Sequence, residues 1–336
     1  MRPKEITVDN KSQVKALSLL SGGLDSRLAV LVLQKQSIHV EGVVFNSPFF
    51  DISSAKEAAE QLKVKLHIVD FTEDIISLIK APRHGFGGGM NPCIDCHARM
   101  IHRAGELMEE LGFDFIATGE VMGQRPMSQN RNALAIVERD SELGGKVVRP
   151  LSAKLLPPTQ PELDSKLDRE QLLDLSGRNR KPQLALAREF GLDRWPSPAG
   201  GCLLTEKRYT QRLRDLAEHE GLDDIFAIRL LKLGRHFRLP DGARLVVGRD
   251  ARNNLQLKKL RREGDLLLHT VNVPGPTVLI PGRPSSADLD LAVELCAAYG
   301  DHDRSYEVTV RVVSSDGSSD RTVTAKDKSD FACFML

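Results

Sequence analysis

Short apolar runs alternate with helix-like segments along the first 120 residues of the chain. Strands are predicted over 14–20, 40–45, 65–71 and 113–118, and helices over 26–36, 53–62 and 98–111. Strands separated by helices lie parallel in one sheet with helices on both faces, so the pattern predicts a doubly wound α/β domain. A ligand of such a domain binds beyond the carboxyl ends of its strands. These ends fall at Leu20, Phe45, Phe71 and Ala117.

The pattern changes after a Pro-rich stretch at 155–162. Helices are predicted over 168–175, 181–190 and 206–220, followed by strands over 243–248 and 266–271, a helix over 287–298 and a strand over 306–313. Residues 314–320 are too polar to predict regular structure. We therefore expect an α/β domain at 1–205, a helical linker at 206–225, a smaller α+β domain at 226–313 and a flexible tail at 314–336.

Composition adds limits on the class of protein. A chain of 336 residues corresponds to about two domains. The longest apolar segments are interrupted by Arg, Asp or Lys, and the first five residues lack the apolar segment of a secretory signal, so we expect a cytoplasmic protein with no membrane partner. Five cysteines in a reducing cytosol are better explained as thiols, metal ligands or catalysts than as disulfides.

Residues 21–26, Ser-Gly-Gly-Leu-Asp-Ser, lie between the first strand and the first helix. Gly22 and Gly23 let the backbone approach a ligand closely, and the first N–H groups of the helix attract phosphate. Ser21 and Ser26 add hydroxyl donors, whereas Asp25 tolerates a phosphate only through a divalent cation. The run lacks the Lys of the usual P-loop. The alternative is a structural Gly-Gly turn.

Three of the cysteines lie in loops that could reach a shared cleft. Cys93 and Cys96 form a C-x-x-C pair after a glycine-rich loop, and Cys202 follows Gly200 and Gly201. A zinc site would need His97 as its fourth ligand. Three thiolates also suit a four-iron four-sulfur cluster with one open iron, and a persulfide relay needs no cluster at all. Cys296 and Cys333 have no polar signature and are expected to lie outside any such site.

Positive charge is concentrated in residues 229–262. This segment holds eleven Lys and Arg but only two Asp, a local net charge of +9, whereas the whole chain has a formal net charge of +1. Such a surface binds nucleic-acid phosphates without sequence preference, and its single aromatic residue, Phe237, argues against base stacking as the main mode. RNA contact is therefore favoured over an ordinary solvated surface.

The Ser-Gly-Gly-Leu-Asp-Ser run resembles the pyrophosphate loop of the PP-loop (N-type) ATP pyrophosphatase superfamily, whose domains have a HUP-like fold. Its members cleave ATP between the α- and β-phosphates and transfer AMP to a substrate oxygen. The resemblance implies that ATP and Mg²⁺ bind here. The implied cofactor-binding residues are Ser21, Gly22, Gly23, Asp25, Ser26, Asn46, Ser47, Thr118 and Gly119.

The Asn-Pro-Cys-x-x-Cys run at 91–96, with Cys202 downstream, resembles the ATP-dependent tRNA thiouridine synthases. Segments 117–129, 176–183 and 197–205 are similar to a bacterial subgroup of predicted tRNA 2-thiouridylases. Glu120 stands where better-known thiouridylases carry a His. Their tRNA-binding β-barrel is not evident, but residues 242–298 resemble the RNA-binding domain of the NFACT family and would take its place. His269 in that segment is expected to be structural or to contact RNA.

Together these features predict an ATP-dependent tRNA sulfurtransferase that adenylates a base carbonyl and replaces its oxygen with sulfur. Cys93, Cys96, Cys202 and Asp25 are the implied catalytic residues, and the three cysteines are the candidate ligands of a [4Fe-4S] cluster. The implied partners are tRNA and a sulfur donor (a cysteine desulfurase, a relay protein or sulfide), and a homodimer is left open. Two alternatives remain: an amide- or nitrile-forming ATP pyrophosphatase acting on a small substrate, and a non-catalytic RNA- or ribosome-binding factor.

Overall fold

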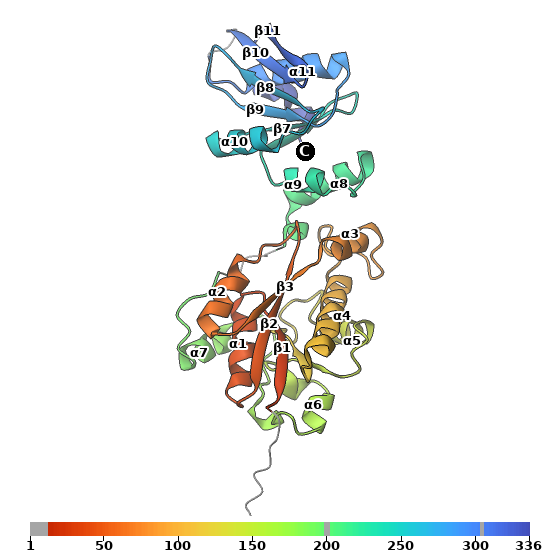
Figure 1. Cartoon of the computed structure of the whole chain (residues 1–336), viewed down its shortest axis with the longest axis vertical. Coiled ribbons are helices and arrows are strands. Elements are labelled where there is room, and N and C mark those ends of the chain that lie inside the picture. Colours follow the sequence, from red (N-terminus) through yellow and green to blue (C-terminus); the bar gives the residue numbers. More distant parts are fainter. Residues whose placement is uncertain (1–12, 198–201, 303–305) are drawn as a thin grey trace, which may run out of the picture. The chain divides into compact units, whose positions relative to one another are not determined.

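The computed structural model describes residues 13–197, 202–302 and 306–336. The chain divides into two compact units, Met1–Thr205 and Glu206–Leu336 (Figure 1). Among the described residues, no helix combines the length and apolar character needed to cross a bilayer.

The first unit is built on a five-stranded sheet. Its strands are β1 (Lys15–Leu19), β2 (His39–Asn46), β3 (Leu66–Asp70), β4 (Phe115–Ala117) and β5 (Val147–Val148). They are all parallel, in the order β3-β2-β1-β4-β5. The predicted doubly wound α/β fold is thus confirmed. The strand order reverses between β1 and β4, so the carboxyl ends of these two strands flank the expected ligand crevice.

Helices cover both faces of this sheet (Figure 1). One layer contains α1 (Leu24–Gln34), α2 (Ser53–Leu62) and α7 (Lys181–Glu189), and the other contains α3 (Thr72–Lys80), α4 (Cys93–Leu111) and α5 (Arg131–Asp140). The sequence pattern did not predict α3 or α5. The helix α4 begins after Pro92, five residues earlier than predicted, and ends where Gly112 adopts a φ of 68°. This earlier start places both cysteines of the C-x-x-C pair in the first turn of α4.

The connection from β5 to α7 differs from the prediction. It contains η1 (Ala153–Leu155), a short α6 (Gln160–Leu163) and η2 (Arg169–Gln171). The helix predicted over 168–175 is wrong beyond Gln171. There the backbone is extended, because the N–H groups of Leu173 and Leu175 donate to the carbonyls of Pro150 and Leu151 instead of forming a helix.

The second unit is an α+β domain with a six-stranded sheet. Its strands are β6 (Arg235–Arg238), β7 (Arg244–Val247), β8 (Leu266–Thr270), β9 (Thr277–Ile280), β10 (Glu307–Ser314) and β11 (Gly317–Thr324). All neighbours pair antiparallel in the order β11-β10-β8-β9-β7-β6. Its helices are α8 (Lys207–His219), α9 (Ile225–Leu230), α10 (Ala251–Leu260) and α11 (Ser286–Ala298).

Two boundaries of this unit differ from the sequence-based expectation. The predicted helical linker at 206–225 contains α8. The Asp215 side chain of α8 accepts a hydrogen bond from Arg238 in β6 at 2.6 Å, so this helix is attached to the sheet of the second unit. The predicted flexible tail forms β11 and η4 (Lys328–Phe334), with Phe331 buried in the core. The exposed polar side chains of β11 obscured a strand that is held by backbone pairing with β10 along its length.

Candidate functional site

The Ser21–Ser26 loop joins the carboxyl end of β1 to the first turn of α1. Gly22 has a φ of 83°, and a Cβ atom there would lie 2.2 Å from the carbonyl carbon of Ser54. Only glycine fits both the conformation and the space. Gly23 caps α1 with extended backbone and makes no side-chain cap, so the N–H groups of the first helical turn stay available.

Arg27 supports this loop through hydrogen bonds, and the sequence pattern did not predict this role. Its side chain is only 2% exposed. Its Nε donates to the carbonyl of Gly22 at 2.9 Å, and its other nitrogens donate to Gln61 and to the Ser54 carbonyl. Burial lowers the pKa of Arg27, while Glu57 opposes this. The guanidinium therefore holds the glycine turn in place.

The two serine hydroxyls of the loop lie next to each other. Ser26 Oγ donates to the Gly23 carbonyl at 2.9 Å, and Ser21 Oγ donates to Ser26 Oγ at 3.3 Å. Ser21 Oγ also accepts the Gly23 N–H at 3.4 Å. The hydroxyls predicted to contact phosphate are therefore held at the turn itself.

Asp25 has one bonded and one unbonded carboxylate oxygen. Gln124 Nε2 donates to Oδ2 at 2.7 Å, whereas Oδ1 is buried and has no hydrogen-bond partner among the residues that the structure describes. Gln124 in turn accepts a hydrogen bond from Gln183 at 3.1 Å. A buried carboxylate oxygen without a donor is a ligand suited to a hard cation. Asp25 thus fits the Mg²⁺ that its position beside a phosphate loop implies.

The carboxyl end of β4 approaches this loop closely. A Cβ atom on Gly119 would lie 2.6 Å from the backbone N and Cα of Ser26, so a side chain at this position would displace the first turn of α1. Thr118 is buried and its Oγ1 donates to Glu120 at 3.2 Å. Asn46, by contrast, is exposed at the end of β2, and its carbonyl accepts the Phe71 N–H. The strand ends therefore bring the predicted nucleotide residues to one edge.

Glu120 anchors a buried charge network behind this edge. Arg149 Nε donates to Glu120 Oε2 at 3.0 Å, and His97 Nδ1 lies 3.0 Å from Oε1. Arg149 also donates to Glu138 at 2.8 Å. Burial alone would raise the pKa of Glu120, but Arg149 and His97 together lower it to about 2. His97 is therefore held by a carboxylate through Nδ1.

The two cysteine segments are held side by side by backbone hydrogen bonds. The Leu203 N–H donates to the Phe49 carbonyl at 3.0 Å, and the Met90 N–H donates to the Leu204 carbonyl at 3.1 Å. The backbone of Cys202 forms an isolated antiparallel β-bridge with Phe50, in the segment after β2. Residues 202–204 thus lie between the end of β2 and the loop before Cys93. The glycines at 200 and 201 fall outside the described residues.

The thiols of Cys93, Cys96 and Cys202 influence one another's ionisation. Burial raises the pKa of Cys96 well above its usual value, and the neighbouring Cys202, Cys93 and Asp95 raise it further. Burial also raises the pKa of Cys202 to about 11, and Cys93 adds to that shift. Each thiolate disfavours a second negative charge nearby, so the three sulfurs share one local environment.

Neighbouring groups distinguish these thiols. Asn91 Nδ2 donates to Cys93 Sγ at 3.1 Å at the start of α4. The positive charge of Arg125, which directly follows Gln124, opposes the rise that burial causes in the pKa of Cys202. Within the described parts of the chain, no set of three or more His, Cys, Asp or Glu side chains forms a ready metal site. Cys296 is buried in the core of the second unit, and Cys333 is exposed on η4.

The basic segment at 229–262 carries less unpaired positive charge than its composition predicts. Three of its arginines pair with acids that precede the segment: Arg238 with Asp215 and Glu220, Arg244 with Glu220, and Arg262 with Asp224. Arg262 also stacks on Phe226, with its guanidinium carbon 3.4 Å from the ring centroid. The predicted +9 is therefore partly neutralised within the second unit.

The first unit combines a parallel sheet of order β3-β2-β1-β4-β5 with a Ser-Gly-Gly-Leu-Asp-Ser turn after β1. Residues 11–154 match the family model described as thiamine biosynthesis protein (ThiI). Residues 234–332 match the family model described as NFACT protein RNA binding domain. The two resemblances inferred from the sequence are thus confirmed, one in each unit.

Similar proteins are named as tRNA 2-thiouridylases or as tRNA sulfurtransferases. The chain is 28% identical to the tRNA-specific 2-thiouridylase MnmA of Tolumonas auensis, over 61% of this chain and 57% of that protein. It is 32% identical to the probable tRNA sulfurtransferase of Acholeplasma laidlawii, over 41% of this chain and 34% of that protein. The chain therefore spans less than two thirds of either relative. A crystal structure of a 4-thiouridine synthetase–RNA complex with bound ATP superposes with a TM-score of 0.39 and 22% identity, covering 64% of this chain and 52% of that one.

Proposed function

We propose that the chain is an ATP-dependent tRNA sulfurtransferase that adenylates a base carbonyl and replaces its oxygen with sulfur. One observation carries the proposal: adjacent residues connect the phosphate loop to the cysteine group. Gly119 lies against the backbone of Ser26, and Glu120 is hydrogen-bonded to His97, which directly follows Cys96. An enzyme that activates a base with ATP and then delivers sulfur to it needs both groups at one site.

The phosphate loop would bind and cleave ATP. Ser21, Gly22, Gly23 and Ser26 would hold the pyrophosphate through hydroxyls and helix N–H groups, with the adenosine toward Asn46, Thr118 and Gly119 at the neighbouring strand ends. Mg²⁺, held by Asp25, would offset the charge of the pyrophosphate. The base oxygen attacks the α-phosphorus, the α–β phosphoanhydride bond breaks and pyrophosphate leaves.

The three thiols would carry the second half of the reaction. Sulfur at the sulfide level adds to the activated base carbon, the C–O bond breaks, and AMP departs with the former base oxygen. In a persulfide relay, a second cysteine would attack the inner sulfur, so that the S–S bond breaks and a disulfide between the two cysteines forms. Adenylation is required because an unmodified oxygen is a poor leaving group, whereas AMP is a good one. We expect this activity in the cytoplasm, because reducing conditions there keep thiols free.

The donor set fits a [4Fe-4S] cluster in its chemistry. Cys93, Cys96 and Cys202 would hold such a cluster through three thiolates from two backbone segments, and the cluster would supply iron for sulfur chemistry at this site. The raised pKa values of Cys96 and Cys202 mean that these thiols are protonated without a metal, so cluster binding would release protons. A persulfide relay on the same cysteines is the alternative that experiment must separate.

Reconstitution with the full chain tests this function. The chain is incubated with tRNA, ATP, Mg²⁺ and either sulfide or a cysteine desulfurase with cysteine, and AMP, pyrophosphate and thionucleosides are measured. Cys202→Ser should abolish thionucleoside formation while Cys333→Ser, an exposed thiol on η4, should not. AMP formation that depends on a small carboxylate instead of tRNA would indicate the amide-forming alternative. AMP formation with no RNA at all would refute the proposal.

Iron and sulfide analysis of anaerobically purified protein separates the two sulfur chemistries. About four irons per chain, lost in Cys93→Ser, would support the cluster. Iron-free protein that turns over with a persulfide donor would refute the cluster but retain the sulfurtransferase.

A further inference from the structure

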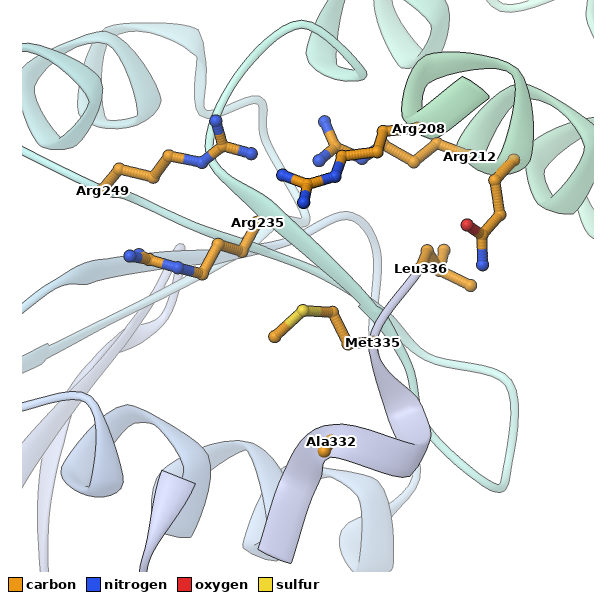
Figure 2. A pocket seen from close by; sticks show the side chains of 8 residues that line it. Arg208, Arg212, Arg235, Arg249, Ala332, Met335 and Leu336 are labelled. Atoms are coloured by element: carbon orange, nitrogen blue, oxygen red, sulfur yellow. The ribbon is translucent and has the colours of Figure 1, made fainter. Parts of the chain in front are cut away.

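The second unit contains a pocket of about 510 Å³ that is lined by four arginines (Figure 2). Arg208 and Arg212 come from α8, Arg235 from β6, and Arg249 from the turn before α10. Figure 2 shows the guanidinium groups of Arg208 and Arg249 turned toward each other. Gln211, Ala332, Met335 and Leu336 complete the lining.

These four arginines lack the acidic partners that other arginines of the unit have. None of them is in an ion pair within the described parts of the chain, whereas Arg238 and Arg244 are paired with carboxylates at 2.6–2.9 Å. Arg235 has its guanidinium carbon 5.3 Å from the ring centroid of Tyr299. A cluster of four unneutralised guanidiniums creates a local positive field that favours an anion.

Arg212 gives the second, independent indication of a ligand. Its side chain is 8% exposed. One Nη donates to the Leu231 carbonyl at 3.0 Å, but Nε is buried and finds no hydrogen-bond partner in the described parts of the chain. Burial lowers the pKa of Arg212, and so do the charges of Arg249 and Arg208, although Glu206 opposes them. A buried donor facing like charges is stabilised when an anion accepts from it.

The chemistry of the pocket favours a phosphate of a polynucleotide. Guanidinium groups bind phosphate oxygens in a paired, planar geometry that they also use with carboxylates. The opposite wall, formed by Ala332, Met335 and Leu336, is apolar at its side chains and can lie against a ribose. A nucleotide in an RNA strand offers both surfaces, whereas a free inorganic anion offers only the first.

We propose that this arginine pocket binds a backbone phosphate of the RNA on which the chain acts. The proposal rests on the proposed function for the identity of that RNA as a sulfur acceptor. Two of the four arginines belong to α8, outside residues 234–332 that match the RNA-binding family. The pocket therefore adds to that domain a contact that its family match does not cover.

A paired set of double variants of the full chain tests the pocket. Arg208→Ala/Arg249→Ala removes two exposed pocket arginines. Arg311→Ala/Arg321→Ala removes the same charge from β10 and β11, where each arginine is paired with an exposed aspartate. Equilibrium binding to a fluorescent tRNA is measured without ATP over a salt series, and thermal unfolding checks that both variants are folded.

The pocket variant should bind tRNA about tenfold or more weakly. Its slope of log K against log salt should fall by about 0.7 to 0.9, because the one phosphate that the pocket neutralises is lost. The control variant should keep the wild-type slope. An unchanged slope in the pocket variant, or an equal change in both variants, would overturn the proposal.

Two further outcomes identify other ligands or separate this proposal from the function. If inorganic phosphate or pyrophosphate stabilises the wild type but not the pocket variant, while the RNA slope is unchanged, the pocket binds a small anion and the RNA assignment is wrong. If the slope falls as expected but the wild type forms no thionucleoside, the proposed function fails and the phosphate site stands.

Discussion

Glu120→Gln should destabilise the first unit substantially, because Glu120 is the buried acceptor for Arg149 and is paired with His97. The folded-state pKa of about 2 lies well below the ordinary 4.5, and this difference corresponds to about 3 kcal/mol of stability at neutral pH. Breaking one side of a buried ion pair costs about 3 to 5 kcal/mol in other proteins, which agrees with this value.

The pH dependence of the effect has a definite direction. Because the pKa of Glu120 is lower in the folded than in the unfolded state, its contribution is complete above about pH 4.5 and is lost as the pH falls toward 2. The stability difference between wild type and Glu120→Gln should therefore be largest at neutral pH and shrink below about pH 4.5.

Urea unfolding followed by tryptophan fluorescence measures this effect in the first unit, which contains Glu120. Trp195 is the chain's single tryptophan and packs partly buried against the core of the first unit. Glu189→Gln is a matched control, since Glu189 is 60% exposed and pairs with Lys35 at 3.3 Å. Exposed pairs contribute about 0 to 1 kcal/mol. A loss in Glu120→Gln no larger than in Glu189→Gln, or one that persists unchanged at pH 3, would refute the reasoning.

Three further outcomes follow from the site and the free thiols. Gly22→Ala should cost more than about 1 kcal/mol of stability in the same urea assay and abolish ATP binding, because its new Cβ would meet the Ser54 backbone. Calorimetry measures the ATP affinity of this variant, and a wild-type value would contradict the prediction. Asp25→Asn should leave urea stability near wild type but abolish Mg²⁺-dependent AMP formation, and undiminished turnover would remove Asp25 from the mechanism. Cys333 should react rapidly with a thiol reagent at pH 8, whereas Cys296, whose pKa burial raises to about 12, should react only on unfolding; mass mapping of the labelled peptides decides this.

Local patterns in the sequence determined the central architecture of the first unit. The strands β1 to β4 and the helices α1, α2 and α4 could be predicted because short apolar runs alternate regularly with helix-like segments there. The Ser21–Ser26 loop was recognisable because its chemistry depends on neighbouring residues. Sequence also indicated Cys202 as a distant partner of the C-x-x-C pair, through its glycine-flanked loop and through the resemblance to thiouridine synthases.

Tertiary structure decided the features that depend on residues far apart in the chain. The support of Gly22 by Arg27, the hydrogen bond from Gln124 to Asp25 and the ion pair of Glu120 with Arg149 have no local signature. The arginine pocket likewise required α8 to pack on the sheet of the second unit. Composition over a window counts charges but cannot show which are paired across the fold, because partners are chosen by three-dimensional packing and not by sequence distance.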